Sequence, residues 1–351
     1  MEDCFGRFLL GFEYFMASRA QENAVITAHQ PEIAVPVPFG VRLRAHVAIM
    51  RLDHSIKNIF LLPGIVVALS LLHPNLSQLS QIRLEPIVIG VIAVTLIACS
   101  NYVLNELLDA PYDRLHPHKC NRPAALGLIE PGAAYLQWLA MMTVGMALAS
   151  RIGLRFAVAA AALWIMGCIY NIRPLRTKDV AYLDVLTESL NNPLRMLLGW
   201  YMVTQVIVPP TSMLCAYWML GCYFMGLKRF SEFREIGSRQ GACDYRKSFK
   251  NYSERSLLGS VVFYASMAMM MFGIFVVRYR IELILAFPFI ALLMAMYFDL
   301  SFKKNSAAQH PEKLYREPLL MTVALLTGVV MIVLLNVHLP MVGQIFAPTK
   351  W

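Results

Sequence analysis

The stretch "IVIGVIAVTLIACSNYVL" at residues 87–104 runs directly into "NELLDAPYDRLHPHKCNRP" at residues 105–123. The first stretch is apolar enough to lie in lipid, because a spanning helix needs about 20 mostly apolar residues. The second carries acids, amides and cations, which are costly at the end of a membrane helix unless they meet partners. This junction predicts a membrane helix that ends in a polar and functional surface.

The rest of the chain has the same apolar character. Of its 351 residues, 58% are hydrophobic and 15% are charged, whereas soluble domains carry about 25% charged residues. The sequence therefore predicts an all-α, polytopic membrane protein with about nine transmembrane helices. The predicted spans are 58–72, 87–104, 132–150, 154–170, 180–203, 206–226, 257–277, 281–298 and 318–337.

Basic residues alternate between the two sides of these spans. Segments 1–57, 105–131, 171–179, 228–256 and 299–317 hold 24 of the 31 Lys and Arg residues, and the opposite loops hold 5. Because cytoplasmic loops carry the excess of cations, the N-terminus is predicted to be cytoplasmic. We expect an integral protein of the cytoplasmic (inner) membrane, with its basic loops open to a phosphorylated substrate in the cytosol.

The two ends of the chain differ from the membrane region. Residues 1–45 include three prolines in "QENAVITAHQPEIAVPVPFG" and lack a signal-peptide pattern, so they predict a loose cytoplasmic extension. Residues 46–340 form the predicted transmembrane domain, and residues 341–351 form a short C-terminal tail.

Several classes of protein are excluded by missing patterns. The seven cysteines form no CxxC pair, which argues against a disulfide framework or a zinc site. The chain contains no Walker A, GxGxxG, HExxH or GxSxG pattern. The net charge of +9 follows membrane topology, so the expected partner is the lipid bilayer and not a nucleic acid.

The first polar constellation lies at the end of the second span. Asn101, Asn105 and Asp109 are spaced i, i+4 and i+8, which is one helical face. Asp113 continues this spacing, but Pro111 disfavours helix before it, so Asp113 is expected just past the helix end or on a kinked turn. Mg²⁺ takes one or two protein carboxylates together with substrate phosphate oxygens. The alternative is an ordinary solvated helix end.

Cations accompany these acids in the following loop, namely Arg114, Lys119 and Arg122. Topology alone would explain the cations but not the carboxylates among them. Acids, a metal ion and Arg or Lys together are the composition expected around a diphosphate leaving group.

The second constellation lies in "YLDVLTESLNNPLR", where Asp184, Glu188 and Arg195 are spaced i, i+4 and i+11 on one predicted helix face. Ionisable residues inside a membrane indicate a functional site by default. The alternative is an internal ion pair that only holds helices together. Two shorter groups lie at span ends, and each is weak alone because charged helix ends are usually solvated. They are Lys228, Arg229 and Glu232 after the sixth span, and Arg51, Lys57 and Asn58 at the entry to the first.

"NELLDAPYD" resembles the NDxxDxxxD signature of the UbiA superfamily of intramembrane prenyltransferases, and the resemblance continues through "DRLHPHKCNRPAALGLI". It covers most of residues 50–337. Two departures are that Glu106 replaces the first aspartate and that Pro111 interrupts the spacing. The resemblance implies helices bundled around a central polar cavity that opens to the cytoplasm. It also implies that Asn105, Asp109 and Asp113 are catalytic and hold Mg²⁺.

Within this superfamily the chain is most similar to the decaprenyl-phosphate phosphoribosyltransferase branch. That branch shows R-x-x-x-x-x-K-N before its first helix, matched by Arg51, Lys57 and Asn58. It also shows K-R-x-x-E at the end of the sixth helix, matched by the group that begins at Lys228. The usual prenyltransferases carry a second aspartate-rich motif at this position, and this chain has none.

The resemblance leaves three functions open. The first is transfer of phosphoribose from phosphoribosyl diphosphate to a polyprenyl phosphate, which the number of cations favours. The second is transfer of a prenyl group from a polyprenyl diphosphate to an aromatic or other polar acceptor, and the third is a non-catalytic transporter or scaffold. The expected substrate-binding residues are Arg51, Lys57, Asn58, Lys119, Arg122, Lys178, Asp184, Glu188, Arg195, Lys228, Arg229 and Glu232.

Overall fold

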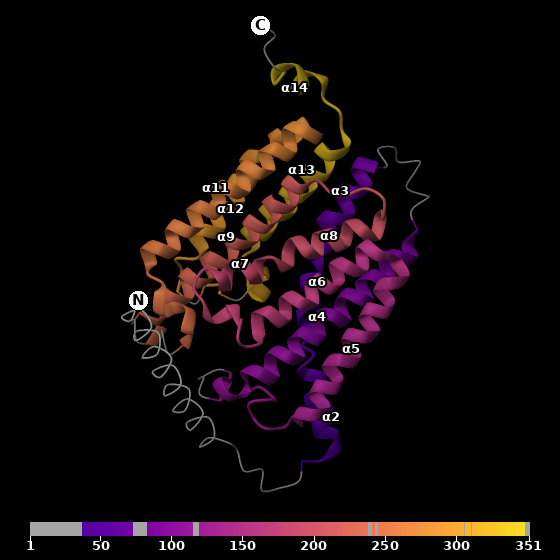
Figure 1. Ribbon diagram of the computed structural model, residues 1–351. Coiled ribbons are helices and arrows are strands. Elements are labelled where there is room, and N and C mark those ends of the chain that lie inside the picture. Colours follow the sequence, from indigo (N-terminus) through magenta and orange to yellow (C-terminus); the bar gives the residue numbers. More distant parts are fainter. Residues whose placement is uncertain are drawn as a thin grey trace, which may run out of the picture. The chain divides into compact units, whose positions relative to one another are not determined.

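The computed structural model describes residues 37–72, 83–114, 119–237, 241–242, 245–304, 306–309 and 311–347, all of which are helical or irregular (Figure 1). The longer helices in chain order are α2 (Phe39–Ala48), α3 (Leu62–Leu72), α4 (Leu84–Asp113), α5 (Pro131–Ile152), α6 (Leu154–Asn171), α7 (Leu183–Ser189), α8 (Asn191–Val203), α9 (Thr211–Ile236), α11 (Glu254–Tyr279), α12 (Phe287–Leu300), α13 (Pro318–Asn336) and α14 (Pro340–Ile345). The 3-10 segments are η1 (Leu52–Leu61), η3 (Thr177–Asp179), η4 (Lys247–Asn251), η5 (Ile281–Ala286) and η6 (Pro311–Arg316).

Seven helical stretches in the described residues are long and apolar enough to cross a membrane. They confirm the prediction of an all-α membrane protein. The predicted number of nine is not confirmed within the described residues, because 180–203 and 206–226 coincide with the more polar helices α7, α8 and α9. The seven stretches are Phe39–Leu72, Leu84–Asp113, Pro131–Ile152, Leu154–Asn171, Glu254–Tyr279, Ile281–Leu300 and Pro318–Asn336.

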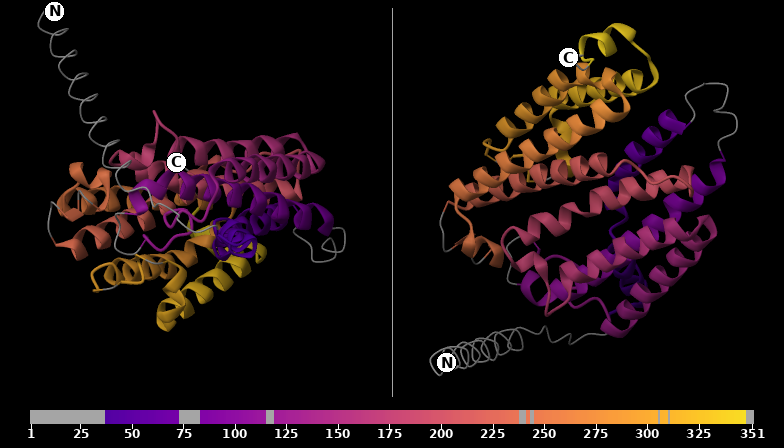
Figure 2. Two further views of the ribbon diagram at one scale, coloured as in Figure 1. Left: turned by 90° about the horizontal axis from the view of Figure 1, so that it is seen from below. Right: turned by 45° about the horizontal axis from the view of Figure 1, so that its top comes forward.

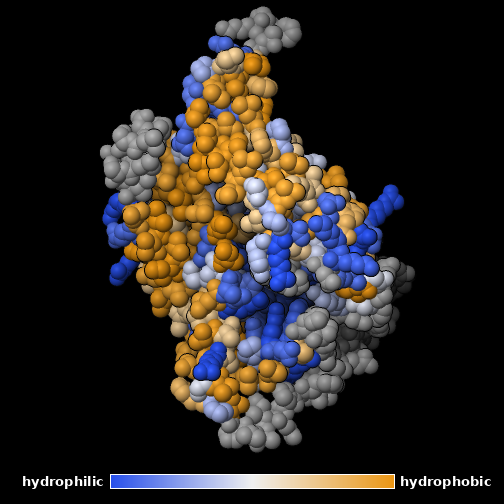
Figure 3. All heavy atoms as spheres, turned by 180° about the vertical axis from the view of Figure 1, so that it is seen from behind, coloured by the Kyte–Doolittle hydropathy of each residue, from blue (hydrophilic) through white to orange (hydrophobic). Residues whose placement is uncertain are grey.

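Large apolar side chains cover much of the face shown in Figure 3. Among the large apolar side chains of the described residues, Leu154, Val277 and Leu325 are 79%, 73% and 72% exposed. A soluble protein rarely exposes large contiguous apolar areas. The exposed apolar side chains on the candidate spans therefore fit a surface that faces lipid.

The chain divides into two compact units. Unit 1 comprises Met1–Leu52 and Cys99–Ala140, and unit 2 comprises Asp53–Ala98 and Met141–Trp351. The division passes through α4 and α5. Helix α2 begins at Phe39, inside the predicted extension 1–45, whereas residues 1–36 lie outside the described part.

In unit 2, α8 lies against α3, α6 and α9, and α9 runs alongside α11 (Figure 2). The contact between α3 and α8 depends on two glycines. A Cβ on Gly64 would lie 1.9 Å from the carbonyl oxygen of Met196, and one on Gly199 would lie 2.1 Å from that of Leu61. Small residues let membrane helices approach this closely. Helix α8 is thus held firmly against the segment that ends η1.

Two predicted helix features differ from the structure. Helix α4 contains Pro111 and continues to Asp113, so Asp113 ends the helix and does not lie past it. The predicted span 180–203 is divided at Leu190 into α7 and α8. Pro193 has no N–H to donate to the carbonyl of Ser189, which weakens one continuous helix at this point.

Candidate active site

In unit 1, the loop that follows α4 folds back onto the end of the helix. Arg122 Nη1 lies 2.6 Å from Asp113 Oδ2, and Asp113 is buried. The side chain of Arg114 donates from Nε to the carbonyl oxygen of Ala125, at 3.1 Å. Lys119 adds a further positive charge that interacts with Asp113. Two of the predicted cations, Arg122 and Lys119, therefore lie beside the last acid of the helix.

A residue outside the predicted site set lies beside these groups. Glu106 is 4% exposed, and its Oε1 has no hydrogen-bond partner among the described residues. The backbone N–H of Ala124 donates to this carboxylate, and Arg122 and Arg51 are the cations that interact with it. The signal for Glu106 in the sequence was its place in the first acid position of the motif.

The helix face of Asn105, Asp109 and Asp113 has a donor set suited to Mg²⁺. Asn105 and Asp109 are half-buried, and Asp109 interacts electrostatically with Asp113 one turn away. No group of three or more His, Cys, Asp or Glu side chains in the described part is placed to hold a metal. The arrangement therefore fits an ion held by one or two carboxylates that takes its remaining ligands from a phosphorylated substrate. The buried, unpartnered Oε1 of Glu106 is a further oxygen beside this face.

In unit 2, a buried ion-pair network joins α7 to the end of α9. Arg229 Nε lies 3.1 Å from Asp184 Oδ2, and its Nη1 lies 2.7 Å from Glu232 Oε2. Asp184 also accepts hydrogen bonds from Ser248 Oγ at 3.1 Å and from the hydroxyl of Tyr252 at 2.8 Å. We name these five side chains the buried network. Since Arg229 and Asp184 are 2% and 0% exposed, the network holds helices and loop together with little surface left for a ligand.

The neighbouring Lys228 has different surroundings. Burial, with smaller contributions from the cations Arg229, Lys57 and Arg246, lowers the pKa of Lys228 to about 8, and the carboxylate of Glu232 opposes this shift. Burial by itself would raise the pKa of Glu232, but the charges of Arg229, Lys228 and Arg246 bring it down to about 2. Several cations thus surround Lys228. We name Lys228, Lys57 and Arg246 the cation cluster.

One member of this cluster, Lys57, lies at the entry to the first predicted span. Lys57 Nζ is 4.0 Å from Glu188 Oε1, and both side chains are about one third exposed, at 36% and 27%. Asn58 donates from Nδ2 to Thr95 Oγ1 at 2.7 Å. Lys57 thus pairs with Glu188, and the side-chain amide of Asn58 binds Thr95 on α4.

Lys178 occupies the loop between α6 and α7 and is 7% exposed. Its Nζ donates to Asn171 Oδ1 at 2.8 Å and lies 6.0 Å from the ring centre of Tyr170. The nearby Arg176 pairs with Asp179 at 3.0 Å. Tyr170 also interacts electrostatically with Arg229 and Arg246, so this loop borders the buried network.

The predicted common helix face of Asp184, Glu188 and Arg195 is not maintained. Asp184 and Glu188 lie on α7, and Arg195 lies on α8. Asp184 belongs to the buried network and Glu188 to the ion pair with Lys57, while Arg195 joins neither acid. Tyr252 and Arg246 of the network region gave no specific sequence signal, because each needs the fold to bring it to Asp184.

Comparisons with known proteins agree with this fold. The UbiA prenyltransferase family matches residues 61–326. The chain is similar to nodulation protein NoeC of Azorhizobium caulinodans, with 25% identity over 242 residues that cover 69% of this chain and 73% of that protein. It is also 32% identical over 110 residues to the uncharacterized protein y4nM of Sinorhizobium fredii, covering 31% of this chain but only 21% of that protein's length.

The fold also resembles the solved structure of a UbiA homolog from Archaeoglobus fulgidus bound to GPP and Mg²⁺. The TM-score is 0.61 at 20% identity, and the match covers 82% of this chain and 99% of that one. This likeness concerns the fold. The family match spans residues 61–326 and includes both the acidic end of α4 and the basic end of α9. The chain belongs to the UbiA prenyltransferase family and is, like the other members, a membrane-embedded transferase.

Proposed function

We propose that this transferase moves phosphoribose from phosphoribosyl diphosphate to a polyprenyl phosphate, as in the decaprenyl-phosphate phosphoribosyltransferase branch. The bond between C1 of the ribose and the diphosphate oxygen breaks, and its electron pair leaves with diphosphate. An anionic oxygen of the lipid phosphate forms the new bond to C1. The product is a phosphodiester, and no proton is gained or lost in the exchange.

The observation that carries this proposal is the cation cluster. Lys228 interacts with the cations Lys57, Arg229 and Arg246 and with one acid, Glu232, and its pKa is lowered to about 8. Repulsion among neighbouring cations is costly and is relieved by a bound anion. A sugar donor that carries a 5-phosphate besides its diphosphate supplies such an anion. A second acidic motif, which would serve a second Mg²⁺–diphosphate contact, is missing here.

The acids at the end of α4 have a separate role in the proposal. Asn105, Asp109 and Asp113 would hold Mg²⁺, which neutralises the charge that develops on the departing diphosphate. Arg122 lies 2.6 Å from Asp113 and fixes its position. Lys119 and Arg51 add positive charge in unit 1, close to the acids Asp113 and Glu106. These cations favour the same leaving group.

Prenyl transfer from a polyprenyl diphosphate to an aromatic or other polar acceptor is the second candidate. It is favoured by the solved relative from Archaeoglobus fulgidus, which is described as bound to GPP and Mg²⁺. In this case a single diphosphate is the only strongly anionic group to be bound. The excess of cations in unit 2 would then have no ligand of matching charge.

We also propose that the protein lies in the cytoplasmic (inner) membrane with its N-terminus in the cytoplasm. The 24 to 5 distribution of Lys and Arg supports this orientation. Residues 46–340 are proposed as the transferase domain, which contains the family match at residues 61–326. Both soluble donor and diphosphate product would then exchange with the cytosol.

The test uses membranes that contain the full chain, incubated with Mg²⁺ and either radiolabelled phosphoribosyl diphosphate or radiolabelled geranyl diphosphate. With added polyprenyl phosphate, we expect label from the sugar donor to enter the lipid fraction. Chelation of Mg²⁺ should stop this transfer. Label transferred only from the prenyl donor would refute the phosphoribosyl proposal and support the second candidate.

A further inference from the structure

A buried arginine of unit 2 has no role in the contacts described above. Arg195 on α8 is 6% exposed, and its Nε has no hydrogen-bond partner in the described part of the chain. No ion pair with a carboxylate is observed for it within the described residues. The group that interacts with it electrostatically is Tyr217 on α9.

Comparison with Arg229 shows how unusual this is. Arg229 is equally buried but bonds two carboxylates at 3.1 and 2.7 Å. A buried charge without such partners costs several kcal/mol, and intramembrane arginines are therefore almost always paired or functional. Within the described residues Arg195 has an electrostatic interaction with Tyr217 but no ion pair with a carboxylate, which indicates that the anion comes from a ligand.

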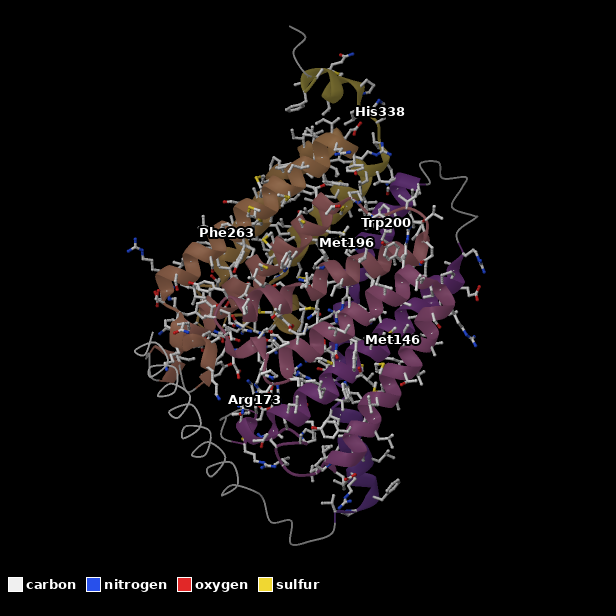
Figure 4. All side chains as sticks on the ribbon, in the orientation of Figure 1. Met146, Arg173, Met196, Trp200, Phe263 and His338 are labelled. Carbon is white, nitrogen blue, oxygen red and sulfur yellow. The ribbon has the colours of Figure 1, made fainter. Side chains whose placement is uncertain are left out.

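The surroundings hold Arg195 in place. Its neighbour Met196 and, one turn on, Trp200 are buried on the same helix (Figure 4). The glycine contact with α3 fixes α8, because a Cβ on Gly199 would lie 2.1 Å from the carbonyl oxygen of Leu61. A guanidinium on such a rigid helix is preorganised for a planar, bidentate acceptor such as phosphate.

A row of contacts connects this position with the cation cluster. Lys57 pairs with Glu188 at 4.0 Å, and Phe60, one 3-10 turn later on η1, meets the ring of Tyr217 edge-on with centres 6.2 Å apart. Glu188 lies on α7 and Arg195 lies on α8, on either side of the division at Leu190. Phe60 and Tyr217 therefore connect the region of Arg195 with the cluster, and Arg195 itself forms no ion pair with Glu188.

We propose that Arg195, assisted by the hydroxyl of Tyr217, forms a second phosphate-binding subsite in unit 2. Resting on the proposed function, this subsite receives the phosphate of the lipid substrate, while the cation cluster receives the sugar donor. A polyprenyl chain is apolar, and the ring of Phe60 against Tyr217 suits its first isoprene unit. The shared chemistry is a phosphate group, which the donor could also supply.

The experiment measures ligand binding and thermal stability of the purified full-length protein in detergent. The probes are farnesyl phosphate, geranyl diphosphate and phosphoribosyl diphosphate with Mg²⁺. The variants are Arg195→Met, which removes the charge at similar volume, Arg195→Lys, which keeps the charge but not the fork, and Tyr217→Phe. Arg278→Met is the matched control, since Arg278 is an exposed arginine of the same unit.

For Arg195→Met we expect at least about tenfold weaker binding of farnesyl phosphate, because a charge-assisted hydrogen bond to phosphate is lost. Its thermal stability without ligand should equal or exceed that of the wild type, because an unpaired buried charge is removed. Farnesyl phosphate should raise the melting temperature of the wild type and of the control but not of the variant. Arg195→Lys and Tyr217→Phe should bind this probe more weakly than the wild type and keep sugar binding.

Loss of sugar-donor binding with intact farnesyl phosphate binding would keep the subsite and assign it to the donor's phosphate. Wild-type affinity of Arg195→Met and Arg195→Lys for all three probes would overturn the proposal. So would a lower melting temperature without ligand together with unchanged affinities, which indicates a purely structural arginine. A wild type that binds geranyl diphosphate and ignores the sugar would defeat the proposed function only. The subsite would then be judged by whether Arg195→Met loses geranyl diphosphate.

Discussion

The buried network of unit 2 and the acidic end of α4 in unit 1 are both built from acids and arginines, but they differ in how completely the acids are bonded. In unit 2, Asp184 accepts from Arg229, Ser248 and Tyr252, and nothing of it is exposed. In unit 1, Asp113 has one close arginine, and Glu106 keeps a buried oxygen without a hydrogen bond in the described residues.

This difference separates two uses of charge in a membrane protein. A carboxylate whose oxygens are all bonded to fixed donors positions its neighbours and has little capacity for a ligand. A carboxylate with a free lone pair retains that capacity, and a metal ion or substrate can use it. We therefore propose that the end of α4 binds a ligand and that the buried network supports the cation cluster.

The largest effect is expected where bonding is incomplete. Asp109→Asn should reduce turnover by about 10²–10³-fold or more, because it removes a charge that the diphosphate-bound metal ion needs. Asp109 is half-buried at the polar end of α4, so the fold should persist. Radiolabel transfer and thermal unfolding measure both effects, and the exposed Asp53→Asn serves as control. Full activity of Asp109→Asn with unchanged Mg²⁺ dependence would remove the metal assignment.

The second effect is expected in the buried network and concerns stability. Asp184→Ala should destabilise the folded protein by about 3–5 kcal/mol, because it leaves Arg229 with a single acid in a buried position. The double variant Asp184→Ala/Arg229→Met should cost less than the sum of its single variants. Denaturant unfolding in detergent measures these free energies. Additive costs would show that the pair is not coupled and that Arg229 is available to a ligand.

Much of this arrangement follows from the sequence, and the reasons for success and failure are local. The apolar run at 87–104 and the acids spaced by four residues predict α4 and its functional face, because helical periodicity decides both. Lys228 and Glu232 are likewise predicted as a site by their place after a span. The predicted continuous helix 180–203 is wrong because the missing N–H of Pro193 weakens it at Leu190.

Contacts between distant residues could not be predicted in this way. Tyr252 reaches Asp184 across 68 positions of sequence, and neither residue type nor spacing indicates the pair. Arg229 was predicted to bind substrate because it stands in a basic motif. Only the fold shows that two carboxylates already occupy it, and that its neighbour Lys228 has the surplus of positive charge.

The third effect sharpens the comparison through pH. Free Lys228 loses its proton around pH 8, well below the ordinary lysine range, because it is buried beside other cations. The donor's phosphates bind the protonated form, so raising the pH from 7 to 9 should weaken donor binding about tenfold. Equilibrium binding of phosphoribosyl diphosphate at several pH values measures this. Lys228→Gln should bind weakly at every pH, and an equally steep pH dependence in that variant would assign the titration to another group.

The smallest effect on stability is expected for the ion pair of Lys57 and Glu188. Its acid is bonded less completely than Asp184 of the buried network. The atoms are 4.0 Å apart and both side chains are partly exposed, so water screens the pair. Glu188→Gln should change the free energy of unfolding by less than about 1 kcal/mol. If the pair lies in the path of the substrate, turnover should fall more than stability does.

A matched comparison with Lys57→Gln in unfolding and transfer assays distinguishes the cases. Parallel small losses of both properties in the two variants would reduce this pair to a structural contact and leave donor binding to Lys228 and Arg246.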